Sequence, residues 1–177
     1  TIFSWVNNFV IIGSINTLVK KSNTWYGYNT DHIAIIQLLD QHTNLKNKKI
    51  LILGTGGVAE ALIHSPFLKP EQLTVAVNNY KTTNNITSRI INFHNIQFHN
   101  FDIIINCTPL GGIKYPLLKH GINLSTLHSQ QIVVDLVYSG LNIGEFSKYC
   151  QEQNILSING LDIFFYQAWL QAFLWHN

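Results

Sequence analysis

Short apolar runs alternate with segments of helical periodicity along most of the chain. Four runs have the length of a strand and are almost continuously apolar, which is typical of strands covered on both faces. They are residues 49–53, 73–77, 101–106 and 132–137. Helices are expected in the segments 58–68, 89–91 and 144–153, and from Leu161 onward. Buried strands separated by helices predict an α/β fold with a doubly wound parallel sheet and helices on both faces.

The two ends of the chain add further patterns. Residues 9–19 are rich in β-forming side chains, and residues 20–23 are typical of a turn. A helix is expected after them, with Thr30 or Asp31 as its N-cap. The last helix carries an apolar stripe at helical spacing, which predicts a face packed on the core. The stripe consists of Leu161, Phe164, Phe165, Ala168, Trp169, Ala172 and Phe173.

Composition and charge exclude several classes of function. Hydrophobic residues make up 46% of the chain and charged residues 11%, so a packed core is expected and global disorder is not. A net charge of +2 provides no basic face for a nucleic acid. The two cysteines form no CxxC pair, and no cluster has metal-ligand spacing, so we expect neither a disulfide framework nor a metal. No signal peptide or bilayer-spanning run is visible, which favours a cytoplasmic protein.

A glycine-rich loop follows the first buried run and opens the next helical segment. It satisfies the G-x-G-x-x-A form of the dinucleotide-binding fingerprint with Gly54, Thr55, Gly56, Gly57, Val58 and Ala59. The first glycine permits a tight turn, the second lets the backbone approach a pyrophosphate, and the alanine lets helix and strand pack closely. The loop predicts a Rossmann-like dinucleotide site. S-adenosylmethionine, which methyltransferases bind with a similar loop, is the rival ligand.

The residues after the second buried run are expected to determine whether the site prefers NAD or NADP. An acidic residue there would hold a ribose hydroxyl, whereas an arginine would hold a 2′-phosphate. The chain has neither at the four positions expected to face the ribose, Asn78, Asn79, Tyr80 and Lys81. These residues leave NADP and NAD both open.

Six motifs, in one order along nearly the whole chain, resemble the shikimate dehydrogenase family. Residues 12–19 (IGSINTLV) resemble the family's IGAxNTLV, and residues 27–31 (GYNTD) resemble its GxNTDG. The glycine loop resembles GAGGxxxA. Residues 102–109 (DIIINCTP) and 134–138 (VDLVY) resemble two strand ends of the family, and residues 159–175 resemble NGLxMLxxQAxxAFxxW.

The resemblance implies NADP-linked reduction of 3-dehydroshikimate to shikimate, a step of the chorismate pathway to the aromatic amino acids. Carried over by position, Asp31 would be the catalytic carboxylate of a Lys–Asp pair. The substrate would be bound by Asn16, Asp31, Tyr138 and Gln167. The nicotinamide pocket would be lined by Thr108, Leu136 and Gly160.

The chain also departs from the family's pattern. The family's catalytic lysine lies before the position at which this chain begins, and no lysine here matches it. His32 replaces the glycine that usually follows the aspartate, and Asn79 replaces the arginine that binds the 2′-phosphate. In the family a methionine usually follows the glycine after the TP motif, and Gly112 stands at that position here. The chain begins with Thr1 and contains no methionine, so we expect it to be part of a longer protein.

From the resemblance we expect residues 1–30 to be the remnant and hinge of a preceding substrate domain. Phe3, Trp5, Val10 and Ile11 would have packed against that domain. Residues 31–177 would form the NAD(P)-binding domain, whose last helix returns to the substrate cleft. The expected partner is a small molecule, with no nucleic acid or membrane, and the expected state is a monomer or homodimer. A dinucleotide-binding fragment without catalysis and a quinate-using relative are the alternatives.

Overall fold

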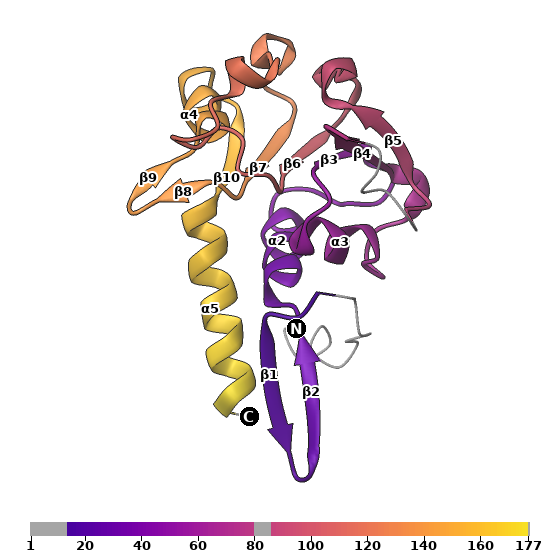
Figure 1. Ribbon diagram of the computed structural model, residues 1–177, viewed down its shortest axis with the longest axis vertical. Coiled ribbons are helices and arrows are strands. Elements are labelled where there is room, and N and C mark those ends of the chain that lie inside the picture. The colour runs from indigo at the N-terminus through magenta and orange to yellow at the C-terminus, as the bar shows by residue number, and fades with distance from the viewer. Residues whose placement is uncertain (1–13, 80–85, 177) are drawn as a thin grey trace.

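The computed structural model describes residues 14–79 and 86–176, and its centre is one sheet of six parallel strands (Figure 1). The strands are β3 (Ile50–Leu53), β4 (Leu73–Val77), β5 (Arg89–Asn92), β6 (Ile103–Asn106), β7 (Ile132–Asp135) and β10 (Leu156–Asn159). Their order across the sheet is β10-β7-β6-β3-β4-β5. After β5 the chain returns to the other side of β3, so a topological switch point lies between β3 and β6. The expected doubly wound α/β fold is confirmed.

Two apolar layers cover the sheet. The helices are α2 (Thr30–Asp40), α3 (Gly57–Ile63), α4 (Glu145–Glu152) and α5 (Gly160–His176). The 3-10 turns are η1 (Pro70–Gln72), η3 (Phe93–Asn95), η4 (Phe98–Asn100), η5 (Leu117–His120) and η6 (Leu124–Thr126). Ile50 and Ile52 face the layer that contains α2, α3 and α5, whereas Leu51 and Leu53 face α4 and the turns η3 to η6. A strand with no exposed face is apolar at every position, as the four runs are.

Two antiparallel hairpins lie outside the sheet. Their strands are β1 (Thr17–Lys21) with β2 (Thr24–Tyr28), and β8 (Tyr138–Ser139) with β9 (Asn142–Ile143). The first hairpin extends away from the sheet beside the carboxyl-terminal half of α5 (Figure 1). The Trp175 indole on α5 donates to the Leu18 carbonyl of this hairpin at 3.2 Å. Within the described ranges, no helix combines the length and apolar character that a bilayer crossing requires.

Residues 89–91 form a strand, so the helix expected there is wrong. β5 pairs in parallel with β4 at the edge of the sheet. Ile90 packs against the layer of α2 and α3, whereas Ile91 packs against the opposite layer. Neighbouring side chains that face opposite layers have the two-residue period of a strand. So short an apolar segment does not reveal that period in the sequence.

The end of α3 and the start of α2 also differ from the prediction. α3 ends at Ile63 and not at residue 68. A proline at position 66 disfavours the helical conformation at the residue before it, which limits the helix. The N-cap of α2 is Asn29, so the prediction of Thr30 or Asp31 is wrong. The Asn29 side-chain oxygen accepts from the His32 N–H at 3.1 Å.

The first hairpin turns more tightly than expected. Lys20 and Lys21 still pair with β2, so the turn is confined to Ser22 and Asn23. Ser22 has a left-handed φ of 54° there. The first part of the β-rich run, residues 9–13, is outside the described residues. The same holds for Phe3, Trp5, Val10 and Ile11.

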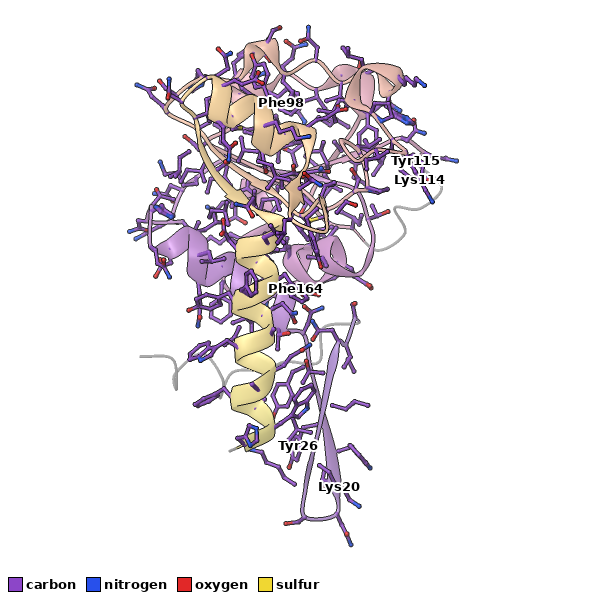
Figure 2. All side chains as sticks on the ribbon, turned by 90° about the vertical axis from the view of Figure 1, so that its left-hand side faces the viewer. Lys20, Tyr26, Phe98, Lys114, Tyr115 and Phe164 are labelled. Atoms are coloured by element: carbon purple, nitrogen blue, oxygen red, sulfur yellow. The ribbon has the colours of Figure 1, made fainter. Side chains whose placement is uncertain are left out.

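Most of the apolar stripe predicted to be buried in α5 is exposed instead. Leu161, Ala168 and Phe173 are half-buried, whereas the other four residues of the stripe are exposed. Phe165 and Trp169 are 65% and 46% exposed. Figure 2 looks onto this outer side of α5, where Phe164 is labelled. The buried apolar side chains of α5 are Ile163, Leu170 and Leu174, and the half-buried Tyr166 also packs against the core. Because α5 is apolar around most of its circumference, the sequence period does not decide which side faces the core.

Candidate functional site

The glycine loop and the loop after β6 meet at the switch point. Gly54 has a left-handed φ of 97° and donates its N–H to the Ala76 carbonyl at 2.9 Å. A Cβ at position 54 would lie 2.7 Å from Cγ2 of Thr108, so the two loops are in direct contact. Glycine meets both the backbone angle and the close approach. Ligands of doubly wound sheets bind at such a point, outside the carboxyl ends of the strands.

The rest of the glycine loop fits a pyrophosphate. Gly56 is exposed, and a Cβ built there meets nothing within 4 Å, so the backbone is open to a ligand. Ala59 is fully buried against the sheet layer, as a small residue at this position should be. At Gly57 a Cβ would collide with the Ser14 hydroxyl, so this glycine also makes room for the segment before β1. The partly buried residues of the loop are Thr55 and Val58.

The three residues predicted to line the nicotinamide pocket come from neighbouring strands. Thr108 follows β6, Leu136 follows β7 and Gly160 follows β10. A Cβ at Gly160 would lie 2.6 Å from the Leu136 carbonyl oxygen, so these two residues are in contact. Thr108 and Leu136 line a cavity of 610 Å³, a volume within the range of small-molecule sites. The walls include Gly112, and also Lys114 and Tyr115, which Figure 2 labels.

Thr30 joins two of the predicted substrate-binding residues. Asn16 donates its side-chain N–H to the Thr30 hydroxyl at 3.0 Å and accepts from the Thr30 backbone N–H at 2.9 Å. The fully buried Thr30 donates its hydroxyl proton to the side-chain oxygen of Gln167 on α5 at 3.0 Å. Within the described part of the chain, the Gln167 NH2 group has no hydrogen-bond partner.

Asp31 is close to both this cluster and the loop after β6. Burial raises the pKa of its carboxyl group above the usual range, and a hydrogen bond from Asn16 opposes part of that rise. The pKa of the Cys107 thiol is raised by burial and, to a smaller extent, by the negative charge of Asp31. Cys107 directly precedes Thr108 in the chain. A carboxyl group with a raised pKa, close to the loop that leads to Thr108, is suited to proton transfer.

Tyr138 lines the cavity and contacts α5 one helical turn before Gln167. It is 43% exposed and lines the cavity beside Leu136. Its ring packs against Phe164 with 5.8 Å between the ring centroids, and Phe164 precedes Gln167 by one turn of α5. This arrangement puts Tyr138 on the cavity side and Gln167 on the α2 side.

The residues predicted to select the cofactor are at the end of β4. Asn78 and Asn79 are exposed there, where the ribose of a dinucleotide would lie. The Asn78 carbonyl accepts from the Asn92 side chain at 3.2 Å, which ties the end of β4 to the end of β5. Tyr80 and Lys81 are outside the described residues.

The sequence analysis did not identify the role of the buried polar residues that hold these groups, and it considered Thr30 only as an N-cap. Thr30, Asn106 and Asp135 are each fully buried. All three lie within motifs that carry the family resemblance. For Asn106 and Asp135, a polar residue at the end of an apolar strand was the available signal, because a buried polar group requires a partner.

No protein-family model matches the chain. Among curated proteins, the shikimate dehydrogenase (NADP(+)) of Methanococcus maripaludis is 31% identical, over 93% of this chain and 63% of its own length. The protein of the same name from Clostridium botulinum strain Hall is 30% identical, over 99% of this chain and 71% of its own length. The chain therefore spans less than two thirds of the Methanococcus protein.

A solved structure has the same architecture. Shikimate dehydrogenase from Aquifex aeolicus matches with a TM-score of 0.76 at 22% identity. The match covers 93% of this chain and 62% of the Aquifex chain. At this identity the likeness establishes the fold, including the six-stranded parallel sheet.

Proposed function

The chain belongs to the shikimate dehydrogenase family, and we propose that it is the cofactor-binding part of an enzyme that reduces 3-dehydroshikimate to shikimate. NADP is the proposed cofactor, because the curated relatives carry NADP(+) in their names. The proposal places the enzyme in the cytoplasm and in the chorismate pathway. Residues 1–30 would belong to the substrate-domain side of the hinge, and residues 31–177 to the cofactor domain.

The observation that carries the proposal is the convergence of Asn16, Asp31 and Gln167. They come from the segment before β1, from α2 and from α5, and Thr30 links the first and the last by hydrogen bonds. Hydroxyl groups of a small polar substrate need such a set of amide and carboxylate partners. The group lies near Cys107, and a Cβ at Gly54 would be 3.5 Å from the Cys107 carbonyl oxygen. Substrate and dinucleotide would therefore meet at the switch point.

The chain's residues fit a dinucleotide along the carboxyl edge of the sheet. The pyrophosphate would lie over Gly54 and Gly56, whose lack of side chains leaves the backbone accessible. The adenosine ribose would reach Asn78 and Asn79 at the end of β4. The nicotinamide would lie against Thr108, Leu136 and Gly160. When bound, the cofactor supplies the hydride, and the protein supplies orientation and the proton.

Asp31 is proposed to handle that proton. Reduction of a ketone adds a hydride to carbon and a proton to oxygen, and a protonated Asp31 can donate the proton to that oxygen. In the reverse direction its carboxylate accepts the hydroxyl proton. The raised pKa of Asp31 favours the protonated form needed for donation. Gln167 would hold a substrate hydroxyl through its NH2 group, since its oxygen accepts from Thr30.

Two measurements on the purified protein test the proposal. Titration with NADPH, and separately with NADH, is expected to reveal binding, with the preferred cofactor reporting how Asn78 and Asn79 read the ribose. Shikimate-dependent reduction of NADP is then followed by absorbance, with quinate as the alternative substrate. Binding without turnover of either substrate would favour a dinucleotide-binding fragment, and no nucleotide binding would contradict the proposal altogether.

A further inference from the structure

A buried carboxylate connects the loops that carry the proposed nicotinamide wall. Asp135, the last residue of β7, is fully buried and pairs in register with Asn106, the last residue of β6. The Asn106 side-chain N–H donates to Oδ1 of Asp135 at 2.9 Å, and the Val137 backbone N–H donates to the same oxygen at 3.2 Å. Both oxygens face hydrogen-bond donors, since Ser147 donates to Oδ2 from its backbone at 3.2 Å and from its hydroxyl at 3.3 Å.

Asn106 passes this connection on to Thr108. Its side-chain oxygen accepts from the Thr108 hydroxyl at 2.6 Å and from the Thr108 backbone N–H at 3.1 Å. Its NH2 group also donates to the Leu110 carbonyl at 2.9 Å, and the Thr108 hydroxyl accepts from the Leu110 N–H at 3.1 Å. All the hydrogen-bonding groups of the Asn106 side chain are therefore used, by Asp135 on β7 and by the turn of the loop after β6.

The first turn of α4 packs against the same carboxylate and donates hydrogen bonds to it. Gly144, the N-cap of α4, has no side chain to cap the helix, and Asp135 accepts from Ser147 in its place. A Cβ at Gly144 would collide with Oδ2 of Asp135, so the close approach requires glycine. The Glu145 N–H donates to the Gly111 carbonyl at 2.9 Å, which joins α4 to the loop after β6.

We infer that Asp135 and Asn106 are positioning residues that hold Thr108 and Leu136 against the nicotinamide half of the cofactor. The inference rests on the proposed function. A carboxylate suits this position because it only accepts hydrogen bonds, and every group around it donates. An amide at position 135 would turn its NH2 group toward donors in either orientation. The loops after β6 and β7 would then lose their common support, whereas the end of β4, where the adenosine ribose would lie, takes no part in the network.

The test compares two ligands that share the adenosine end of the cofactor. Asp135→Asn is expected to raise the Kd for NADPH about tenfold, because a buried hydrogen bond to a charged group is lost. The Kd for adenosine 2′,5′-bisphosphate, which lacks the nicotinamide half, is expected to stay within about twofold of the wild type. Calorimetric titration of both ligands measures the difference. Equal weakening of both ligands, or no change in either, would overturn the inference.

Three further variants keep the test decisive. Ser147→Ala removes one hydrogen bond to the same carboxylate on the α4 side and is expected to leave both Kd values unchanged. If it weakens NADPH as much as Asp135→Asn does, the docking of α4 is responsible and the inference fails. If Asp135→Asn does not fold, the Thr108 variants replace it in the test. Thr108→Val is expected to weaken the binding of NADPH and not that of adenosine 2′,5′-bisphosphate, and Thr108→Ser is expected to bind NADPH as the wild type does. A Thr108→Val variant that binds NADPH normally would overturn the inference. A wild type that binds neither ligand overturns the proposed function, and this inference with it.

Discussion

Thr30 donates its hydroxyl proton to the side-chain oxygen of Gln167, at 3.0 Å and across 137 positions of the sequence. The same hydroxyl accepts from Asn16 at 3.0 Å, so one small side chain sets the orientation of two amides. Because its oxygen is occupied, the Gln167 amide would present its NH2 group to the substrate in the proposed site. The proposed substrate side of the site would therefore depend on a residue that does not itself touch the substrate.

Replacing Thr30 with valine should disturb the substrate side and spare the cofactor side. The valine keeps the volume but removes the hydroxyl, so Asn16 and Gln167 lose their shared partner. We expect the KM for shikimate in the whole enzyme to rise about tenfold, the equivalent of about 1.4 kcal/mol. The Kd for NADPH should not change. Thr30→Ser, which retains the hydroxyl, should keep KM within about threefold, and an equal defect in both variants would argue against the relay.

Asp31→Asn should remove proton transfer and leave the nucleotide site intact. General acid–base catalysis contributes about 10²-fold to 10⁴-fold, so turnover should fall by at least about 10²-fold. NADPH titration should give the wild-type Kd, because no predicted cofactor residue depends on this carboxylate. Steady-state kinetics and titration on the same sample separate the two effects. Full activity in the variant would exclude Asp31 as the proton donor.

The same substitution should stabilise the fold at neutral pH. Burial raises the pKa of Asp31 in the folded state, so folding favours the protonated carboxyl and disfavours the ionised one. The wild type therefore gains stability as pH falls through the raised pKa and loses it as pH rises. Asp31→Asn should have the higher free energy of unfolding at pH 7, and the difference should shrink toward the usual aspartate pKa near 3.8. Urea unfolding across this range measures it, and a wild type more stable at pH 7 would contradict the expected sign.

Alanine at two glycines of the loop should separate folding from binding. Gly54→Ala combines a left-handed φ of 97° with a contact of 2.7 Å to Thr108, and should lower the free energy of unfolding by about 1–3 kcal/mol. Gly56 has a φ of −72° and open space where a Cβ would lie, so Gly56→Ala should change the free energy of unfolding by less than about 0.5 kcal/mol. Its Cβ would instead obstruct the pyrophosphate and weaken NADPH binding. Unchanged binding in a folded Gly56→Ala variant would place the pyrophosphate elsewhere.

A substitution on the buried side of α5 should lower the free energy of unfolding much more than one on the exposed side. Leu170 is buried, and Leu170→Ala should lower the free energy of unfolding by about 2–5 kcal/mol. Phe165 is 65% exposed, and Phe165→Ser should change it by less than about 0.5 kcal/mol. Chemical denaturation of both variants tests the orientation of the helix. A large loss in Phe165→Ser would mean that this side is covered.

Much of the site could be predicted because its residues stand in local motifs. The glycine fingerprint identified Gly54 and Gly56 from backbone requirements alone, and the family resemblance drew attention to Asn16, Asp31 and Gln167. The partners that orient these residues were not identified. Thr30 bonds to residues far away in the chain, and nothing in the three-residue stretch around it specifies such a contact.

The sequence by itself determined the parallel sheet and the family. Continuous apolarity over a strand's length reports burial on both faces, and a glycine loop reports a backbone constraint, so both are visible without knowledge of distant contacts. Only the tertiary structure decided that residues 89–91 extend the sheet, which side of α5 faces inward, and that Asp135 supports Thr108 through Asn106. Each of these depends on what packs against the segment. An apolar or polar side chain takes its role from neighbours supplied by other parts of the chain.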